Sequence, residues 1–388
     1  MTALDQGRAI GPGRLRAHTS LDRMAYDAGN EWWWLSEAET FDRKSFFFSE
    51  PIDVALASNG HTFLDDSFRC SRTAGIQALH SERLSLVGGD GIALYDGNPV
   101  YDTLFDLAPW EEHSNISGFE LGVSADFASP VGIRHLSGGP YFLGFNGRFT
   151  NYCHWIQQMN PWHFAFVNLR KRFSGLKLVL PPFKDGLFRY QTLSLLGITE
   201  DDIVIVRDKE ALSFESAILC GRFDLWAVPS YSLRAARALS EAVDDGYPEW
   251  PAAERIFLHR RVNRRTFVNF ENFRPLLEAR GFTILEFENV SVRNQIRAFR
   301  NARYIMAEHG AGMINLMFCR PGARVLELFN PACVQPAFWS VASVSGVDYG
   351  YAVGQHVPTA AFREPGWNSS YSISPERFEA AIEALLAA

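Results

Sequence analysis

The sequence has few cysteines and no apolar run that approaches the roughly 20 residues of a membrane-spanning helix. Its five cysteines are an odd number, lie far apart and form no C-x-x-C pair, which argues against a disulfide framework and against a zinc site. The first 25 residues are polar and contain no apolar core segment. We therefore expect a flexible tail over residues 1–25, no secretory signal, and a cytoplasmic protein without a membrane span, while peripheral membrane association stays open.

An excess of positive charge is also lacking. The formal net charge is −7, so the protein as a whole repels nucleic acid, which we do not expect as a partner. No two aspartates follow the spacing D-x-D and H-E-x-x-H does not occur, so we expect no metal and no bound cofactor. Hydrophobic residues make up 47% and aromatic residues 14% of the 388 residues, which predicts a packed globular protein of two or three domains.

Strand and helix patterns alternate from residue 151 onward. Before this point, residues 45–150 carry short apolar segments separated by Gly, Asn, Asp and Pro, which predicts β-rich additions. Beyond it we predict an α/β fold of two halves in series, each with a mostly parallel sheet and helices on both faces. The predicted strands are 176–180, 202–206, 255–259, 282–287, 304–307 and 324–329, and the predicted helices begin near 152 or span 184–196, 269–280, 291–300, 313–318 and 375–386.

The best linker pattern in the chain is residues 244–251, which hold two prolines, a glycine and several charges. It predicts an N-terminal domain over 26–243 and a C-terminal domain over 252–370. The last segment, 371–388, has Ser374 as helix N-cap and a proline at the first helical position. We expect this helix to pack back toward the N-terminal domain.

The strongest indication of function is the turn Glu308-His-Gly-Ala-Gly312, which lies between a predicted strand and a predicted helix. Two glycines allow a sharp turn and let a ligand approach the amides of the first helical turn, where partial positive charge favours a phosphate. A glycine-rich turn without a ligand is an equally common reading. Asn315 stands where a full G-x-G-x-x-G would have its third glycine, which weakens a dinucleotide-binding interpretation.

Arginines supply the positive charge that a phosphate site needs. Five of them cluster around the end of one predicted strand, and Arg260 and Arg265 should neighbour the glycine turn, whereas Arg261 and Arg264 fit a solvated loop. Glu327, in the following strand, can accept hydrogen bonds from ribose hydroxyls or pair with an arginine.

Two histidines are candidates for proton transfer. His154 begins a predicted helix, and His309 lies in the glycine turn. Each is a possible base for a sugar hydroxyl, although a single histidine is more often a packed or solvated residue.

With these residues assembled, the chain resembles glycosyltransferase family 61 over residues 151–330. The similar stretches are Asn151-Tyr-Cys-His-Trp155, Arg255-Ile-Phe-Leu-His-Arg260, Arg265-x-x-Val-Asn269-x-Glu271, Glu308-His-Gly-Ala-Gly-Met-Ile-Asn-Leu-Met-Phe318 and Pro321-Gly-Ala-Arg-Val-Leu-Glu-Leu328.

The resemblance implies a GT-B fold, with two facing Rossmann-like domains, the donor in the C-terminal one and the acceptor in the cleft. It implies inverting, metal-independent transfer from a nucleotide sugar, often UDP-linked xylose or N-acetylglucosamine, to a glycan or glycolipid acceptor. Eukaryotic members of the family carry a Golgi membrane anchor, whereas no membrane span is expected here. We therefore expect a bacterial enzyme, with a possible role in surface polysaccharide assembly. From the resemblance and the motifs we expect three groups of site residues. His154 and His309 are catalytic, and Asn151 and Trp155 lie on the acceptor side. The donor-binding residues are Arg260, Arg265, Glu308, Gly310, Ala311, Gly312, Asn315 and Glu327.

Two other functions stay open. The segment 157–162 departs from the acidic run expected after His154, which would fit a binding module on a degenerate transferase scaffold. A nicotinamide-dependent oxidoreductase is the third reading, although the missing third glycine and the late position of the turn argue against it.

Overall fold

The structure, a computed structural model, divides into two compact units that are described separately. The first unit comprises residues 1–38 and 74–223, and the second comprises 39–73 and 224–388. Most of the predicted tail, and residues 245–251 of the predicted linker, lie outside the described residues. The structure describes residue 24 and residues 27–52, 70–73, 75–87, 91–96, 98–100, 132–182, 187–207, 210–244, 252–261, 264–360 and 362–387.

The first unit is built on a mixed sheet. Its described strands run in the order β10 (Ile203–Ile205), β9 (Lys177–Leu180), β8 (Gly132–Leu143), β11 (Glu210–Cys220), β5 (Leu84–Val87), β6 (Ile92–Tyr95) and β7 (Asn98–Pro99), with β4 (Ile76–Ser81) joining β11 to β1 (Glu31–Ser36). The first four strands are parallel. The strands before residue 100, predicted as β-rich additions, pair antiparallel.

The helix predicted to begin near Tyr152 is present and changes its winding along its length. A short α2 (Tyr152–His154) runs into the π-helix η7 (Trp155–Met159) and then into α3 (Asn160–Leu169). Trp155, Trp162 and Phe166 are fully buried along it, so apolar burial fixes the segment in the unit. The remaining described helices of the unit are α4 (Leu187–Leu195) and the 3₁₀-helix η8 (Glu200–Asp202).

The second unit has a parallel five-stranded sheet in the order β13 (Thr283–Glu286), β12 (Arg255–His259), β14 (Tyr304–Glu308), β15 (Arg324–Phe329) and β16 (Asp348–Val353). In chain order this is 2-1-3-4-5, a doubly wound arrangement whose direction of growth reverses between β12 and β14. The carboxyl ends of strands at such a switch point are where ligands bind in this class of sheet. The predicted strands 255–259 and 324–329 match β12 and β15 residue for residue.

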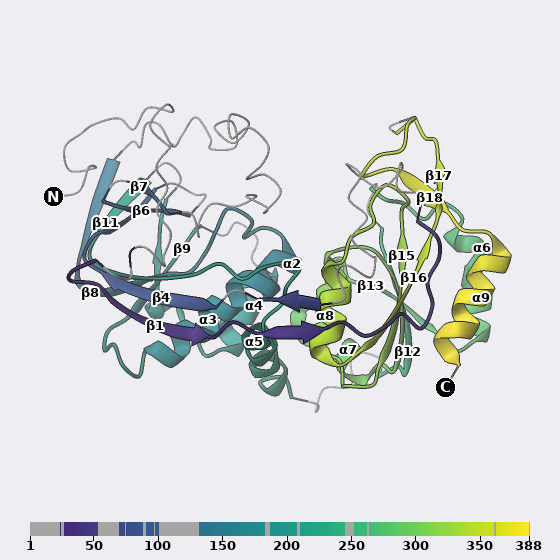
Figure 1. Ribbon diagram of the computed structural model, residues 1–388, viewed down its shortest axis with the longest axis horizontal. Coiled ribbons are helices and arrows are strands. Elements are labelled where there is room, and N and C mark those ends of the chain that lie inside the picture. The colour runs from purple at the N-terminus through teal and green to yellow at the C-terminus, as the bar shows by residue number, and fades with distance from the viewer. Residues whose placement is uncertain are drawn as a thin grey trace. The chain divides into compact units, whose positions relative to one another are not determined.

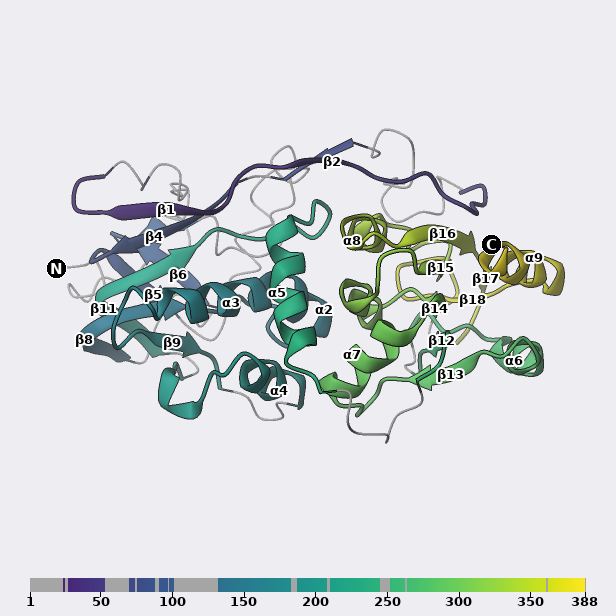
Figure 2. The same ribbon diagram turned by 90° about the horizontal axis from the view of Figure 1, so that it is seen from below.

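Helices cover both faces of this sheet (Figure 1 and Figure 2). On one face lie α6 (Phe270–Ala279) and α9 (Pro375–Leu386), and on the other lie α7 (Val292–Asn301), the 3₁₀-helix η9 (Ala311–Phe318) and α8 (Ala337–Ser345), with α5 (Ser230–Glu241) beside η9. Two small sheets complete the described part, β2 (Thr40–Asp42) with β3 (Cys70–Arg72), and β17 (Gln355–Val357) with β18 (Ser370–Ser372).

Helix α9 packs on the sheet of its own unit. Its apolar residues Phe378, Ile382 and Leu385 are buried in one cluster with aromatic side chains that include Phe267 and Phe273. The rings of Phe273 and Phe378 are stacked with centroids 4.1 Å apart. The apolar face of α9 is therefore occupied within the second unit, and the expectation that this helix returns toward the N-terminal domain stays a prediction.

The fold is mixed α/β with mostly parallel sheets, which confirms the prediction at that level. The facing GT-B arrangement and the predicted domain limits stay predictions. Residues 39–52, 70–73 and 224–243, which the sequence placed in the first domain, pack with the second unit. Among the described residues, none of the helices combines the length and apolar character needed to cross a bilayer.

The α9 contact is open to a stability test. Replacing buried Ile382 with Ala removes apolar contacts and leaves a cavity, so we expect a loss of about 2–5 kcal/mol in the free energy of unfolding of this unit. Glu379→Ala, on the exposed side of the same helix, should change it by less than about 0.5 kcal/mol. Urea denaturation of the full chain measures both, and equal midpoints for the two variants would contradict this packing.

Candidate functional site

The carboxyl edge of the sheet in the second unit brings together the residues that follow β12 and β14. His259 ends β12, Glu308 ends β14, and Arg260 and His309 come next in the chain. These two strands are hydrogen-bonded neighbours and flank the switch point. Most of the predicted donor-binding residues of the second unit therefore lie where the sheet topology favours a ligand.

Arg260 lies against the backbone of the glycine turn. Its Nη1 donates to the carbonyl oxygen of His309 at 2.5 Å. A Cβ at Gly310 would stand 2.8 Å from Arg260 Nε, so Gly310 is needed for this close approach and not for its φ of 173°, which is extended. A Cβ at Gly312 would stand 2.9 Å from Leu258 Cδ2, which is another tight contact.

Arg265 is the second cation at this edge, and its backbone is in the left-handed region with φ 54°. Its N–H donates to the carbonyl oxygen of Asn368 at 2.9 Å, and its Nη1 contacts Cys333 Sγ at 3.5 Å. Its Nε is buried and has no hydrogen-bond partner among the described residues. The guanidinium is therefore held in place but only partly satisfied.

The two guanidinium groups influence each other. Burial lowers the pKa of Arg260, and the positive charge of Arg265 lowers it further, while Glu308 opposes the shift. Two like charges that share a half-buried site repel each other, and an anion between them would remove this penalty. In contrast, Arg261 and Arg264 are exposed.

Backbone amides add to the positive potential. The first backbone hydrogen bond of η9 runs from Met313 N–H to Gly310 C=O. The amides of Gly310, Ala311 and Gly312 precede it and, as at any helix start, have no partner within the helix. The segment predicted as helix 313–318 is a 3₁₀-helix that begins at Ala311. Its start therefore coincides with the glycine turn.

A buried hydrogen-bond network of side chains holds the glycine turn in place. His309 Nδ1 lies 2.5 Å from Glu327 Oε1, and Tyr349 Oη lies 2.5 Å from Glu327 Oε2. Gln335 Nε2 lies 2.9 Å from His309 Nε2. Because the Gln335 amide nitrogen can only donate, these partners assign the imidazole proton to Nδ1, which donates to Glu327.

Burial is the largest cause of the pKa shifts in this network. It raises the pKa of Glu327 well above its usual range, against the opposing effects of Tyr349 and Arg265. Burial, together with the charges of Arg265 and Arg260, lowers the pKa of His309 well below 6.5. Both Glu327 oxygens have partners and the side chain is fully buried, so Glu327 fixes His309, and the ribose contact expected for it stays a prediction.

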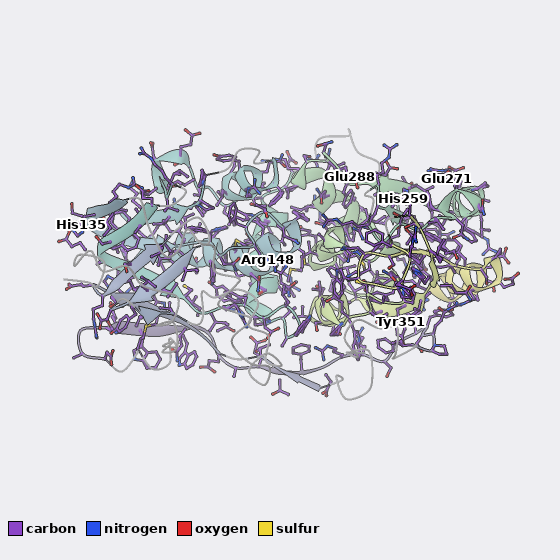
Figure 3. The ribbon with its side chains drawn as sticks, turned by 90° about the horizontal axis from the view of Figure 1, so that it is seen from above. His135, Arg148, His259, Glu271, Glu288 and Tyr351 are labelled. Carbon is purple, nitrogen blue, oxygen red and sulfur yellow. The ribbon has the colours of Figure 1, made fainter. Side chains whose placement is uncertain are left out.

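Glu308 and His259 form a second pair, on the opposite face of the sheet. His259 Nδ1 lies 2.6 Å from Glu308 Oε1, which also accepts from Arg260 N–H at 3.3 Å. Burial raises the pKa of Glu308, and His259 opposes the shift. The His259 ring stacks on Phe270 with centroids 3.8 Å apart and lies close to Glu271 (Figure 3).

Asn315 is part of the support of the turn. Its side chain is fully buried, and its Nδ2 donates to Gln295 Oε1 at 3.0 Å and to the Gly312 carbonyl at 2.9 Å. The Asn315 amide nitrogen therefore supports the turn from within the protein, and the donor contact expected for Asn315 stays a prediction.

The first unit holds the acceptor-side candidates. Asn151 is exposed and caps α2 by accepting from Cys153 N–H at 2.9 Å. His154 is half-buried, with Nδ1 2.9 Å from Gln158 Oε1. Trp155 is fully buried and donates its indole N–H to Thr192 Oγ1 at 2.7 Å, which fixes the helix in this unit, and its acceptor-side role stays a prediction. The adjoining π-helix is a feature that proteins often keep at functional sites.

Three residues of this site were not predicted from the sequence: His259, Gln335 and Tyr349. Strand alternation places His259 on the same face as Glu308, which is a signal that could have revealed this pair. Gln335 and Tyr349 lie in segments without a motif, and only the packing of β15 on β16 brings Tyr349 to Glu327.

The protonation of His309 can be measured directly. Because burial lowers its folded pKa well below the ordinary value of 6.5, we expect the ring to be neutral at pH 6.5, with its proton on Nδ1. The stability that this group contributes is complete above 6.5 and is lost as the pH falls below that value, since the unfolded ring then binds a proton. Long-range ¹H–¹⁵N spectra report the protonation state and the tautomer of the ring. Titration near 6.5, or a proton on Nε2, would contradict the assignment.

The family model Glycosyltransferase 61 matches residues 152–326, a segment that runs from α2 to β15 and contains His154, Arg260, Arg265 and the glycine turn. No curated protein matches the chain. Residues 152–326 carry the sequence pattern of glycosyltransferase family 61, which confirms the resemblance drawn from the motifs and supports glycosyl transfer as the activity.

Proposed function

We propose that this protein is an inverting, metal-independent glycosyltransferase that moves a sugar from a UDP-linked donor to a hydroxyl group of a glycan or glycolipid. The family match supports the reaction class. The observation that carries the proposal is the pair Arg260 and Arg265, two mutually repelling guanidinium groups beside an amide-lined turn. We further propose a cytoplasmic role in bacterial surface polysaccharide assembly, with peripheral membrane association where the acceptor is a lipid.

The donor diphosphate is the anion that this edge fits. Arginine forks match phosphate oxygens and bind them with two parallel hydrogen bonds. As the bond between the anomeric carbon and the diphosphate oxygen breaks, negative charge develops on the leaving group. Arg260, Arg265 and the amides of Gly310–Gly312 stabilise that charge in the role that a divalent cation has in other transferases. Neutral His309 keeps the turn in position.

The acceptor hydroxyl needs a base, and we propose His154. The Gln158 oxygen at Nδ1 places the imidazole proton on that nitrogen and the lone pair on Nε2. The hydroxyl oxygen attacks the anomeric carbon from the face opposite the diphosphate, His154 takes the hydroxyl proton, and the configuration is inverted. UDP leaves with the bonding electron pair of the broken bond.

Arg265 provides the first test. Arg265→Asn removes the guanidinium while Asn tolerates the left-handed backbone, so we expect turnover to fall at least about 100-fold, the usual effect of losing one preorganised donor to developing charge. Release of UDP from a panel of UDP-sugars, assayed in EDTA with a glycan acceptor, measures it. Arg264→Asn, at the exposed neighbouring position, is the matched control and should keep full turnover. Wild-type rates in Arg265→Asn would discard the assignment.

His154 provides the second test. His154→Gln removes the base, and we expect turnover to fall by about 10²–10⁴. The affinity for UDP should stay unchanged, because His154 belongs to the first unit and the proposed donor residues belong to the second. His135→Gln, an exposed histidine on β8, is the control (Figure 3). Unchanged turnover in His154→Gln, or a parallel loss in both variants, would rule out His154 as the base.

A further inference from the structure

Trp367 is an unusual tryptophan in the second unit. Its side chain is 43% exposed, and in the described part of the chain its ring enters no ring pair and its indole N–H has no hydrogen-bond partner. Trp339 in the same unit shows the ordinary pattern, since it is buried, packs on Phe46 and donates to the Lys44 carbonyl at 3.1 Å. An aromatic face left open in this way is available to a ligand.

The backbone that carries Trp367 is tightly held. Asn330, which directly follows β15, donates its Nδ2 to the carbonyl oxygens of Gly366 and Trp367 at 3.0 and 3.2 Å. Gly366 N–H donates to Ser369 Oγ at 2.6 Å, and Ser369 N–H donates back to the Gly366 carbonyl at 2.9 Å. The open ring is therefore presented from a fixed turn, so little conformational entropy would be lost when a ligand stacks on it.

This turn adjoins the proposed diphosphate site. The residue after Trp367 is Asn368, whose carbonyl oxygen accepts the Arg265 N–H at 2.9 Å. Val268, the other large apolar side chain of the second unit that is exposed among the described residues, lies on the segment of Arg265, and its N–H donates to Tyr371. Both exposed apolar residues thus flank Arg265 on two segments that are hydrogen-bonded to each other.

The order of the strands places Trp367 on one side of the phosphates. Arg260 follows β12, the glycine turn follows β14, and Asn330, which anchors Trp367, follows β15, so the three lie in sequence along one edge. Neighbouring strands are about 4.8 Å apart, so the anchor of Trp367 lies roughly one strand beyond the turn. In a nucleotide sugar the diphosphate separates the base from the transferred sugar, and such a spacing suits the base.

We propose that Trp367 is the platform on which the nucleobase of the donor stacks, and that it determines the affinity for the nucleoside part of the substrate. This inference rests on the proposed function. Stacking of a base on an aromatic side chain is worth about 1–3 kcal/mol, which corresponds to a roughly 5- to 150-fold change in the dissociation constant.

Calorimetric titrations of the full chain with UDP and with inorganic pyrophosphate separate the two parts of the ligand. We expect Trp367→Ala to weaken UDP binding by about 5- to 150-fold and to leave pyrophosphate binding unchanged. Trp367→Phe, which keeps an aromatic face, should retain most of the UDP affinity. Trp34→Ala, which removes a tryptophan of similar exposure (47%) from the first unit, is the matched control and should bind both ligands like the wild type.

Each other outcome has a distinct meaning. Equal UDP affinity of wild type and Trp367→Ala would overturn the platform and leave the transferase proposal standing. Loss of affinity for a UDP-sugar but not for UDP would overturn it in favour of stacking on the sugar. Equal losses for UDP and pyrophosphate would show that Trp367 only supports the local structure. A wild-type protein that binds pyrophosphate but not UDP would overturn the proposed function itself.

Discussion

The repulsion between Arg260 and Arg265 is the constraint on which the rest of the site depends. The protein holds two guanidinium groups at the switch point of a parallel sheet, where burial already disfavours their charge. A fold retains such a cost where a ligand of opposite charge offsets it. The amides at the start of η9 favour the same sign of ligand, so the proposed donor site combines two cations with a helix start.

The glycine turn and its supports show how that site is kept in position. Gly310 lets the Arg260 side chain lie against the backbone, while His309, Glu327 and Tyr349 form a buried chain beneath the turn. A buried polar network whose members are satisfied rigidifies its surroundings. His309 and Glu327, for which the sequence suggested catalysis and ribose binding, are both members of this network.

Local patterns in the sequence were sufficient for much of the fold. Strands β12 and β15 and the capped helix α9 were predicted at their observed limits, because periodicity, a serine N-cap and a proline at the first turn are local signals. Helices α5 and α8 and strands β11 and β16 were missed. Their formation depends on burial in the tertiary structure and not on a local signal in the sequence. The partners of Glu327 could not be predicted from the sequence either, because they depend on the register between β15 and β16, which no single segment encodes.

The most direct test of the central claim is a crystal structure of the protein with UDP, grown in EDTA. We expect the β-phosphate to lie between the Arg260 and Arg265 guanidinium groups, within hydrogen-bond distance of the amides of Gly310–Gly312, with no cation beside it. Phosphates bound at another edge of the sheet, or bound only when a divalent ion is supplied, would contradict it.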